Sequence, residues 1–283
     1  MNWATPSSEG APNRTAQAKG ETVLALVTLH YRNLALGKTE PVTMILPEAS
    51  DAWQPPFPVI YLLHGIGDDH TDWVRRTRIE QYVQSLPVIV VMPTTPWQSM
   101  YVDGVNGPPA ATAIAKHLVD FIDSRFQTAR EARYRAVCGL SMGGYGALHL
   151  ALSYPDRFGA AASHSGALSF GHQDFAEEAA QSPRSERFRR LTKMLLGDAP
   201  RGGPCDLYAQ ASALPKERRP ALRIDCGVDD FLIEANRAFH AHLEAIGYEH
   251  EYAEHPGGHT WDYWDEHVRD SIDFFVRTLG WLA

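Results

Sequence analysis

The chain has 283 residues, of which 44% are hydrophobic, and it carries a formal net charge of −8 at pH 7. This length and apolar content allow one large α/β domain, and we interpret residues 21–283 as a single domain preceded by a flexible leader over residues 1–20. The acidic balance, with no basic run longer than Arg189-Arg190, argues against a nucleic acid or an anionic membrane as the partner. A small molecule is the expected partner, and the sequence leaves a homo-oligomer open.

The cysteine content bears on the compartment. The chain has 3 cysteines, an odd number, and two of them lie in apolar strand-like contexts where free buried thiols are common. Neither an N-terminal signal peptide nor an apolar run long enough to cross a membrane is visible in the sequence. We therefore expect a cytoplasmic protein.

The pattern of apolar residues predicts strands that alternate with helices. Alternating and β-branched residues predict an antiparallel hairpin first, and fully apolar runs then predict buried central strands. The expected strands are, in chain order, 22–31, 42–46, 59–63, 88–92, 134–140, 160–163, 222–226 and 249–253. The expected helices are one from about Trp73 to Ser85, then 110–126, a short one after residue 146, 232–246 and 263–279. This order is typical of a mostly parallel sheet with helices on both faces, which gathers ligands at the carboxyl ends of its strands.

A long polar segment with helix-favouring composition interrupts this alternation at about residues 166–219. It falls between two strands rather than inside one, and it is rich in charged residues. Long insertions of this kind often cover active sites. We therefore predict that residues 166–219 form a helical lid.

Residues 135–149 combine a short apolar strand, a glycine-rich turn and a helix. Within them, Gly139-Leu-Ser-Met-Gly143 fits the Gly-x-Ser-x-Gly nucleophile elbow, which holds its serine out on a strained turn. The pentapeptide alone fits an ordinary glycine-rich turn equally well. The strand before it and the Ala/Leu-rich helix after it favour the elbow, so Ser141 is the candidate nucleophile.

A serine nucleophile of this type requires an acid and then a histidine downstream. Asp225, Asp229 and Asp230 are the candidate acids, and Asp225 lies inside a predicted strand. Spacing alone does not separate the other two, one of which we expect to cap the next helix. The acid therefore belongs to the pair Asp229 and Asp230.

The chain has 13 histidines, and only a few are placed to reach a serine at the strand ends. His259 follows Gly257-Gly258 in a loop after a strand, and His255 is its rival closer to that strand. Other histidines lie in helix or strand patterns, where packed or solvated roles are usual. We predict that His259 is the general base.

A hydrolase of this type also needs backbone donors for the oxyanion. The turn His64-Gly65-Ile66-Gly67 follows the first central strand, where the second donor is expected. The backbone amides of Ile66 and Met142 are therefore the candidate oxyanion hole. The nearby cluster Asp68-Asp69-His70-Thr71-Asp72 matches no metal-ligand spacing, so we expect a solvated polar loop and neither a metal nor a cofactor.

Four motifs in this order resemble the Putative esterase family of the α/β-hydrolases, which includes esterase D, S-formylglutathione hydrolases, tributyrin-type esterases, feruloyl esterases and the antigen 85 group. The matching pieces are Tyr61-Leu-Leu-His-Gly65, Gly139-Leu-Ser-Met-Gly-Gly-Tyr-Gly-Ala-Leu148, Asp225-Cys-Gly-Val-Asp-Asp-Phe-Leu232 and Pro256-Gly-Gly-His-Thr-Trp-Asp-Tyr-Trp264. In the family the acid lies three residues after the glycine of Gly-x-x-Asp, so the resemblance favours Asp230. It also implies an α/β-hydrolase fold.

The resemblance implies a serine carboxylesterase that hydrolyses small acyl esters through an acyl-enzyme, with no metal. The same three side chains would also serve an S-formylglutathione-type thioesterase, a feruloyl or acetyl carbohydrate esterase, or an acyltransferase. A non-catalytic binding protein with a hydrolase fold is the alternative from another class, because fold alone does not fix function.

Overall fold

The structure is a computed structural model that describes residues 24–48, 53–96, 98–172 and 183–282. The leader predicted over residues 1–20 lies outside the described residues. Eight strands within these ranges form one sheet in the order β1-β2-β4-β3-β5-β6-β7-β8. Their bounds are β1 Leu24–Asn33, β2 Lys38–Pro47, β3 Val59–Leu63, β4 Ile89–Pro93, β5 Arg135–Leu140, β6 Ala160–His164, β7 Ala221–Gly227 and β8 His250–His255.

The sheet is mostly parallel, as the strand and helix alternation predicts. The hairpin β1–β2 is antiparallel, and β2 also pairs antiparallel with β4, through Val42 opposite Pro93. From β4 to β8 every neighbouring pair is parallel. The carboxyl ends of β3, β5, β6, β7 and β8 therefore meet at one edge, where an α/β sheet binds its ligands.

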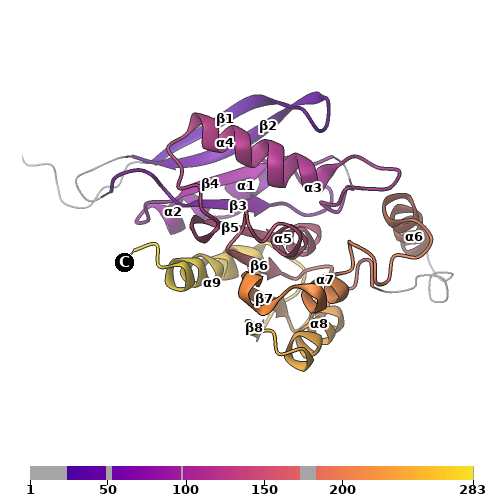
Figure 1. Ribbon diagram of the computed structural model, residues 1–283. Coiled ribbons are helices and arrows are strands. Elements are labelled where there is room, and N and C mark those ends of the chain that lie inside the picture. The colour runs from indigo at the N-terminus through magenta and orange to yellow at the C-terminus, as the bar shows by residue number, and fades with distance from the viewer. Residues whose placement is uncertain (1–23, 49–52, 97, 173–182, 283) are drawn as a thin grey trace, which may run out of the picture.

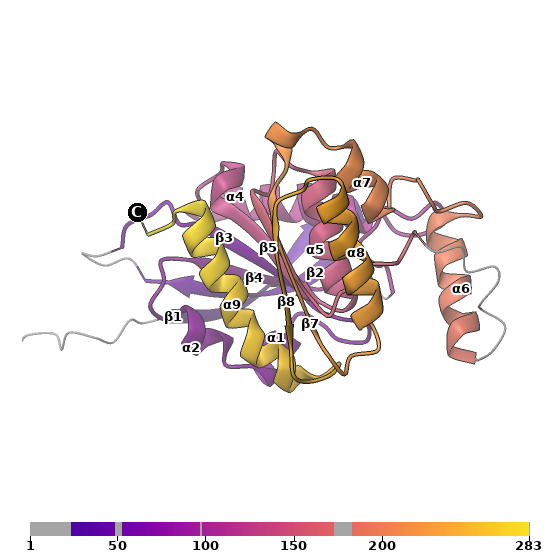
Figure 2. The same ribbon diagram turned by 90° about the horizontal axis from the view of Figure 1, so that it is seen from below.

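Helices cover both faces of the sheet, so its central strands are buried on both sides (Figures 1 and 2). Tyr61 and Val137 point into one apolar cluster and Leu62 and Cys138 into the other, because successive strand residues face opposite sides. The first face is covered by α3 Ala110–Thr112, η1 Ala113–Leu118, α4 Val119–Arg125, α5 Met142–Ser153, α7 Leu207–Ala213 and α8 Ile233–Ala245. The second is covered by α1 Asp72–Arg76, α2 Ile79–Val83 and α9 Trp261–Leu279.

Two of the predicted helices differ in detail from the structure. The helix expected from Trp73 to Ser85 is two short helices, because the chain turns at Thr77-Arg78. There the Arg78 amide donates to Asp265 Oδ1 at 2.8 Å, and the Arg78 guanidinium contacts Asp265 Oδ2 at 2.9 and 3.0 Å. The helix expected over 110–126 contains the π-helical segment η1 and ends at Arg125.

The described part of the insertion predicted as a lid contains the helices α6 and α7, joined by turns and irregular segments. Its helix α6, Pro183–Leu196, stands apart at one end of the molecule in both ribbon views and is anchored by buried Leu191 and Leu195 (Figures 1 and 2). The second helix, α7, packs near α5 and α8, with Gln210 contacting His149 at 3.2 Å. Residues 173–182 lie outside the described ranges, so a covering role for the insertion stays a prediction.

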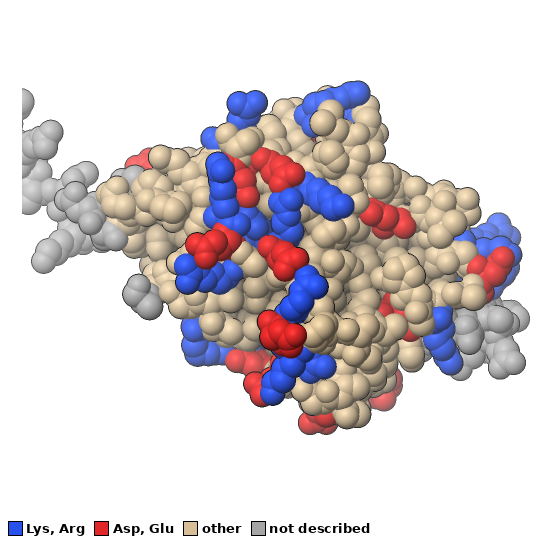
Figure 3. Space-filling view, viewed as in Figure 1, with Lys and Arg blue, Asp and Glu red and all other residues tan. Residues whose placement is uncertain are grey.

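The described surface is mixed in charge. Figure 3 shows basic and acidic side chains interspersed on the face that it presents. Ion pairs in the described part of the chain include Arg237 with Glu254 at 2.7 Å and Arg277 with Glu251. No helix within the described ranges has the length and apolar character needed to cross a membrane.

Candidate active site

Ser141 lies in the turn between β5 and α5, with φ of 54° and ψ of −114°. A non-glycine residue in such a conformation stores roughly 1–3 kcal/mol of strain. The surrounding backbone holds it there: the Ser141 amide donates to the carbonyl of His164 at 2.9 Å, and its carbonyl accepts from the Tyr145 amide at 3.1 Å. The strained turn presents Oγ at the carboxyl edge of the sheet.

The glycines of the motif are required by close backbone contacts. A Cβ at position 139 would lie 2.3 Å from the carbonyl oxygen of Gly143, and one at position 143 would lie 2.5 Å from that of Leu63. Real side chains do not approach backbone this closely. The start of α5 therefore lies directly on β5 and β3 because glycine occupies both positions.

His259 lies in the loop between β8 and α9, and its imidazole joins the other two predicted residues. Its Nε2 is 3.0 Å from Ser141 Oγ, and its Nδ1 is 2.8 Å from Asp230 Oδ2. An ionised carboxylate only accepts hydrogen bonds, so Nδ1 carries the proton and Nε2 of the neutral ring is free to accept the Ser141 proton. The loop is tied to the acid loop by the Asp229 amide, which donates to the Gly257 carbonyl at 2.9 Å.

Asp230 is the member of the acid pair that faces His259. It is 2% exposed, whereas Asp229 is exposed and contributes only its backbone amide. Burial by itself would raise the pKa of the Asp230 carboxyl, but hydrogen bonds from His259, the Leu232 amide and Ser165 hold that pKa below its usual value. The acid is thus kept ionised beside the imidazole.

The rival histidine takes part in a different group. The His255 ring stacks on that of His267, with ring centroids 4.0 Å apart, and one nitrogen of each lies within 4.8 Å of a carboxylate oxygen of Asp270. Two of the three are already engaged with each other or with a cation: His267 Nδ1 is 3.0 Å from Asp270, and the Arg223 guanidinium lies 3.5 Å from the same carboxylate. Because this ion pair already occupies the carboxylate, we assign the group no metal.

The two predicted oxyanion donors lie beside Ser141. A Cβ on Gly65 would be 3.7 Å from Ser141 Cβ, which places the turn that carries Ile66 against the nucleophile. Within the described ranges, the Ile66 amide donates to no protein acceptor. Met142 is the first residue of α5, so its amide lacks an acceptor within the helix. Both amides are thus available to a negatively charged oxygen.

The acidic cluster after this turn differs in part from the solvated loop that we predicted. Asp72 is 5% exposed and contacts Arg76 at 2.8 Å, and Asp68 accepts from the Gly65 amide at 3.2 Å. Burial and the nearby Asp72 carboxylate raise the pKa of Asp68. These carboxylates shape the turn that carries Ile66.

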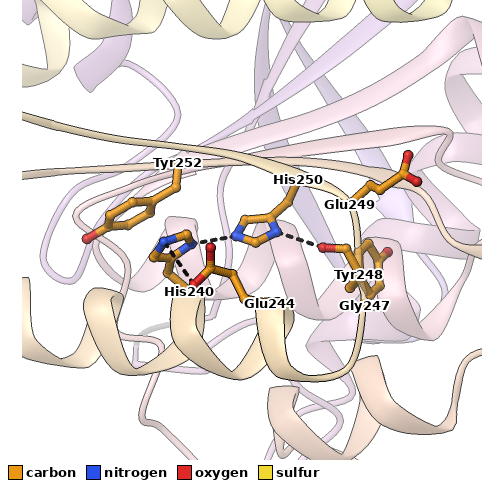
Figure 4. Close-up of a pocket in the computed structure, with 7 residues that line it drawn as sticks. All are labelled: His240, Glu244, Gly247, Tyr248, Glu249, His250 and Tyr252. Atoms are coloured by element: carbon orange, nitrogen blue, oxygen red, sulfur yellow. Dashed lines mark hydrogen bonds and ion pairs between the residues drawn. The ribbon is translucent and has the colours of Figure 1, made fainter.

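An open pocket lies between α8 and β8, away from the predicted catalytic residues (Figure 4). It measures about 640 Å³, and His240 Nδ1 is 2.7 Å from His250 Nε2 within it. His250 Nδ1 contacts the Tyr248 carbonyl at 2.7 Å, so the pair forms one hydrogen-bonded chain. None of the serine, acid and base candidates lines this cavity.

Three further side chains lie near the site, and two of them, Phe231 and Ser165, escaped the sequence prediction. The Phe231 ring centroid lies 4.6 Å from that of His259, and the Trp264 ring meets His259 edge to face at 4.9 Å. Ser165 is fully buried and accepts a hydrogen bond from Trp264 Nε1 at 3.3 Å. A signal was present for Ser165, since it directly follows a strand that ends at the ligand-binding edge.

A serine on a strained strand-to-helix turn, an imidazole and a buried carboxylate at the carboxyl edge of a mostly parallel sheet define the class of α/β-hydrolase serine hydrolases. Within that class, the chain belongs to the Putative esterase family, which matches residues 34–272. The chain is a carboxylic ester hydrolase, as its four motifs predict.

Known proteins similar to the chain agree with this assignment. Acetyl esterase of Caldicellulosiruptor saccharolyticus is 26% identical over 270 residues, which cover 90% of this chain and 99% of that protein. Esterase Rv1288 of Mycobacterium tuberculosis (strain ATCC 25618 / H37Rv) is 31% identical over 256 residues, 81% of this chain and 54% of that protein.

Solved structures give the same result. FphF, a fluorophosphonate-binding serine hydrolase of Staphylococcus aureus, superimposes with a TM-score of 0.77 at 27% identity, over 91% of this chain and 99% of that one. S-formylglutathione hydrolase (FrmB) of the same organism gives a TM-score of 0.75 at 27% identity, over 90% and 99%. The predicted α/β-hydrolase fold is thereby confirmed.

Proposed function

We propose that this esterase hydrolyses small acyl esters through an acyl-enzyme on Ser141, with His259 as the general base and Asp230 as its acid partner. The observation that carries the proposal is the continuous chain from Ser141 Oγ to His259 Nε2, 3.0 Å, and from His259 Nδ1 to Asp230, 2.8 Å. Both contacts are within the range for proton transfer and for fixing the imidazole tautomer.

In the first step His259 Nε2 takes the Ser141 proton as Oγ attacks the ester carbonyl carbon. The buried Asp230 carboxylate stabilises the imidazolium that forms, and the hydrogen bond that it accepts from the Leu232 amide keeps it from rotating away. The imidazolium then protonates the leaving alkoxide, which departs as an alcohol. The acyl group stays on Ser141.

The carbonyl oxygen becomes negatively charged in the tetrahedral intermediate. The amides of Ile66 and Met142 are the donors that stabilise it, reinforced by the N-terminal end of α5. Removal of one such donor typically costs about 3 kcal/mol of transition-state stabilisation. In the second half of the reaction His259 activates a water molecule, which releases the acid and restores Ser141.

The preference for a small acyl group is supported by the full-length match to a protein named acetyl esterase. The apolar side chains of Ile66 and Phe231, which are 43% and 60% exposed, flank the predicted catalytic residues on the solvent side. They offer contacts to short alkyl or aryl groups. No charged side chain is required for such a substrate.

The test is hydrolysis of p-nitrophenyl esters from acetate to long acyl chains by wild type, Ser141→Ala and Asp230→Asn. We expect the highest kcat/KM at short chains, no burst or turnover with Ser141→Ala, and a loss of about 10⁴-fold in kcat with Asp230→Asn, because the imidazole tautomer is no longer fixed. Asp229→Asn is the matched control and should keep wild-type activity. Turnover by Ser141→Ala would refute the proposal.

A thioesterase is the second candidate, because the chain resembles a protein named S-formylglutathione hydrolase over 99% of that protein's length. The same residues would attack a thioester carbonyl. Comparing kcat/KM for S-formylglutathione and p-nitrophenyl acetate decides between the two. Adding an acceptor alcohol tests acyl transfer, and failure of a phosphonate to label Ser141 would favour a non-catalytic binding protein.

We also infer a cytoplasmic location. The three cysteines Cys138, Cys205 and Cys226 are free and buried, as suits a reducing compartment. Burial raises the pKa of Cys205 to about 11, with a smaller contribution from Asp103, so this thiol is unreactive at neutral pH. Fractionation of cells that express the protein would test the location.

A further inference from the structure

Tyr101 occupies a strained position in the loop between β4 and α3. It is fully buried and has φ of 56°, and Met100 before it has φ of 51°. A positive φ is a genuine outlier for a bulky side chain, and it persists only where the surrounding structure holds it. Tyr101 has no part in the proposed mechanism, so its strain requires another explanation.

The loop that carries Tyr101 lies beside the turn that carries Ile66, because β4 and β3 are parallel neighbours in the sheet. Polar contacts within the loop hold its backbone. The Tyr101 amide donates to Ser99 Oγ at 3.3 Å, and Ser99 Oγ lies 2.8 Å from Thr95 Oγ1. These contacts fix the direction in which the Tyr101 side chain leaves the loop.

The Tyr101 side chain joins the end of β3 to α5. Its hydroxyl donates to the carbonyl of His64 at 3.1 Å, and its ring meets the His64 ring edge to face with centroids 6.0 Å apart. The ring also lies directly on Gly146, where a Cβ would be 2.4 Å from Tyr101 Cδ2. Tyr101 therefore holds His64 while it is braced against the helix that follows Ser141.

His64 in turn holds the peptide group that contains the Ile66 amide. His64 Nδ1 lies 2.8 Å from the carbonyl oxygen of Gly65, and a carbonyl only accepts, so Nδ1 donates. In a trans peptide the C=O of Gly65 and the N–H of Ile66 share one plane and point in opposite directions. The hydrogen bond from His64 therefore sets the direction of the Ile66 N–H, and it also polarises the peptide group.

The His64 ring makes this contact at a cost. Its Nε2 is buried and has no hydrogen-bond partner within the described residues, which is unfavourable for a polar nitrogen. Burial lowers the pKa of His64, against smaller opposing contributions from the Gly65 carbonyl and nearby carboxylates, so the ring is neutral with its proton on Nδ1. The contact with Gly65 is thus the use that this buried ring has for its proton.

We propose that Tyr101 is a positioning residue that orients the Ile66 amide toward the oxyanion, acting through His64. The inference rests on the proposed function, in which the Ile66 amide is an oxyanion donor. The oxyanion exists only in the tetrahedral intermediate and the transition states that lead to it. Tyr101 therefore contributes to kcat and not to the binding of the ester.

The first experiment compares wild type with Tyr101→Phe, which removes the hydroxyl and keeps the ring. With p-nitrophenyl acetate we expect kcat and kcat/KM each to fall about tenfold, because a misdirected donor is a part of the roughly 10²–10³-fold loss seen when a whole donor is removed. KM should stay within about twofold.

Tyr248→Phe is the matched control. Tyr248 is buried, and its hydroxyl donates to the Pro220 carbonyl at 2.8 Å, just before β7 and so at the opposite end of that strand from the site. We expect both variants to lose a similar amount of Tm, because each leaves a carbonyl without its hydroxyl donor. Only Tyr101→Phe should lose kcat.

A trifluoromethyl ketone separates an effect on the oxyanion from a general loss of structure. Its carbonyl carbon bonds to Ser141 Oγ, its oxygen takes the electron pair as an oxyanion, and the Ser141 proton passes to His259. The inhibition constant should rise about tenfold in Tyr101→Phe. The inhibition constant of the corresponding methyl ketone, which binds without this addition, should stay within about twofold.

Variants of His64 test the intermediate step. His64→Asn keeps an N–H near the place of Nδ1, whereas His64→Leu removes it, so His64→Leu should lose more kcat. The double variant Tyr101→Phe/His64→Leu should be no slower than His64→Leu alone if Tyr101 acts through His64.

Three outcomes would overturn the inference: wild-type kcat in Tyr101→Phe, an equal kcat loss in Tyr248→Phe, or an unchanged inhibition constant for the trifluoromethyl ketone. The proposed function fails in a different way. It fails if Ser141→Ala retains turnover, so the two failures are distinguishable.

Discussion

His164 and Asp225 form a fully buried ion pair on neighbouring strands, with His164 Nδ1 2.9 Å from Asp225 Oδ1. His164 Nε2 lies 3.0 Å from Ser271 Oγ on α9, so the pair joins β6, β7 and α9. The carbonyl of His164 also accepts the amide of Ser141 at 2.9 Å. The pair therefore supports the end of β6, which holds the Ser141 turn through this backbone hydrogen bond.

This pair predicts a loss of stability at alkaline pH. Burial alone would lower the pKa of His164, but the Asp225 charge and hydrogen bond outweigh it and raise the pKa to about 10. The unfolded value is about 6.5, so the stabilisation is fully present below pH 6.5 and is lost as pH rises through about 10. Urea midpoints from pH 6 to 10.5 should fall for wild type.

The control for that measurement is the double variant His164→Gln/Asp225→Asn, which removes both charges and leaves no buried unpaired ion. Its urea midpoint should vary less with pH between 7 and 10.5 than that of wild type. Parallel curves for the two proteins would show that other groups cause the alkaline loss. Either single variant should be less stable than the double variant.

Gly139→Ala should damage the fold rather than the chemistry. The new Cβ would lie 2.3 Å from the Gly143 carbonyl oxygen, and Gly143 cannot retreat because it packs closely on the Leu63 backbone. We expect a loss of about 3 kcal/mol in the free energy of unfolding, measured by urea denaturation. At Gly258 the nearest atom to a new Cβ is 3.5 Å away, so Gly258→Ala should lose far less stability. Equal losses would contradict the packing argument.

The positions of Ser141 and His259 were predictable because local sequence defines them: glycines around Ser141 allow the turn, and Gly257-Gly258 precedes His259 on a loop at a strand end. The choice of the acid residue required more than local sequence. Asp229 and Asp230 are adjacent, and only the resemblance favoured Asp230, because the direction of each side chain depends on the turn after β7. In the structure Asp230 is buried and Asp229 is exposed.

The features that sequence reasoning missed depend on contacts between distant segments. The break at Thr77-Arg78 is stabilised by Asp265, almost two hundred residues later, which no local helix pattern reveals. Ser165 accepts the hydrogen bond of Trp264 only after the end of β6 and the start of α9 have come together. Local periodicity predicts elements, whereas such hydrogen bonds require the tertiary structure.

Phe231 should influence which alcohol groups the enzyme accepts. Its side chain is 60% exposed, and its ring centroid lies 4.6 Å from that of His259, the proposed general base. We expect Phe231→Ala to raise KM for phenyl acetate up to about tenfold and to leave KM for methyl acetate unchanged, since an aromatic pair is worth about 0.5–1.5 kcal/mol. Val228→Ala, an exposed apolar residue of the same loop, is the control. Equal KM changes for both esters would argue against this contact.

His149 should weaken the fold at acidic pH. It is 4% exposed on α5, stacks on Tyr145 with ring centroids 5.7 Å apart and contacts Gln210 at 3.2 Å. Burial lowers its pKa to about 4, with smaller opposing contributions from Gln210 and Asp103. The unfolded chain therefore binds the proton first as pH falls.

The contribution of His149 should consequently lower the free energy of unfolding by about 3 kcal/mol between pH 6.5 and about 4. Below about pH 4 this contribution should level off. Urea denaturation of wild type and His149→Gln across this range measures the effect. We expect the variant to be less stable at pH 7, because its side chain packs less well, but to lose less stability on acidification. His117→Gln, at a half-buried position on η1, should follow the wild-type curve. If His149→Gln also follows that curve, another group accounts for the acid sensitivity.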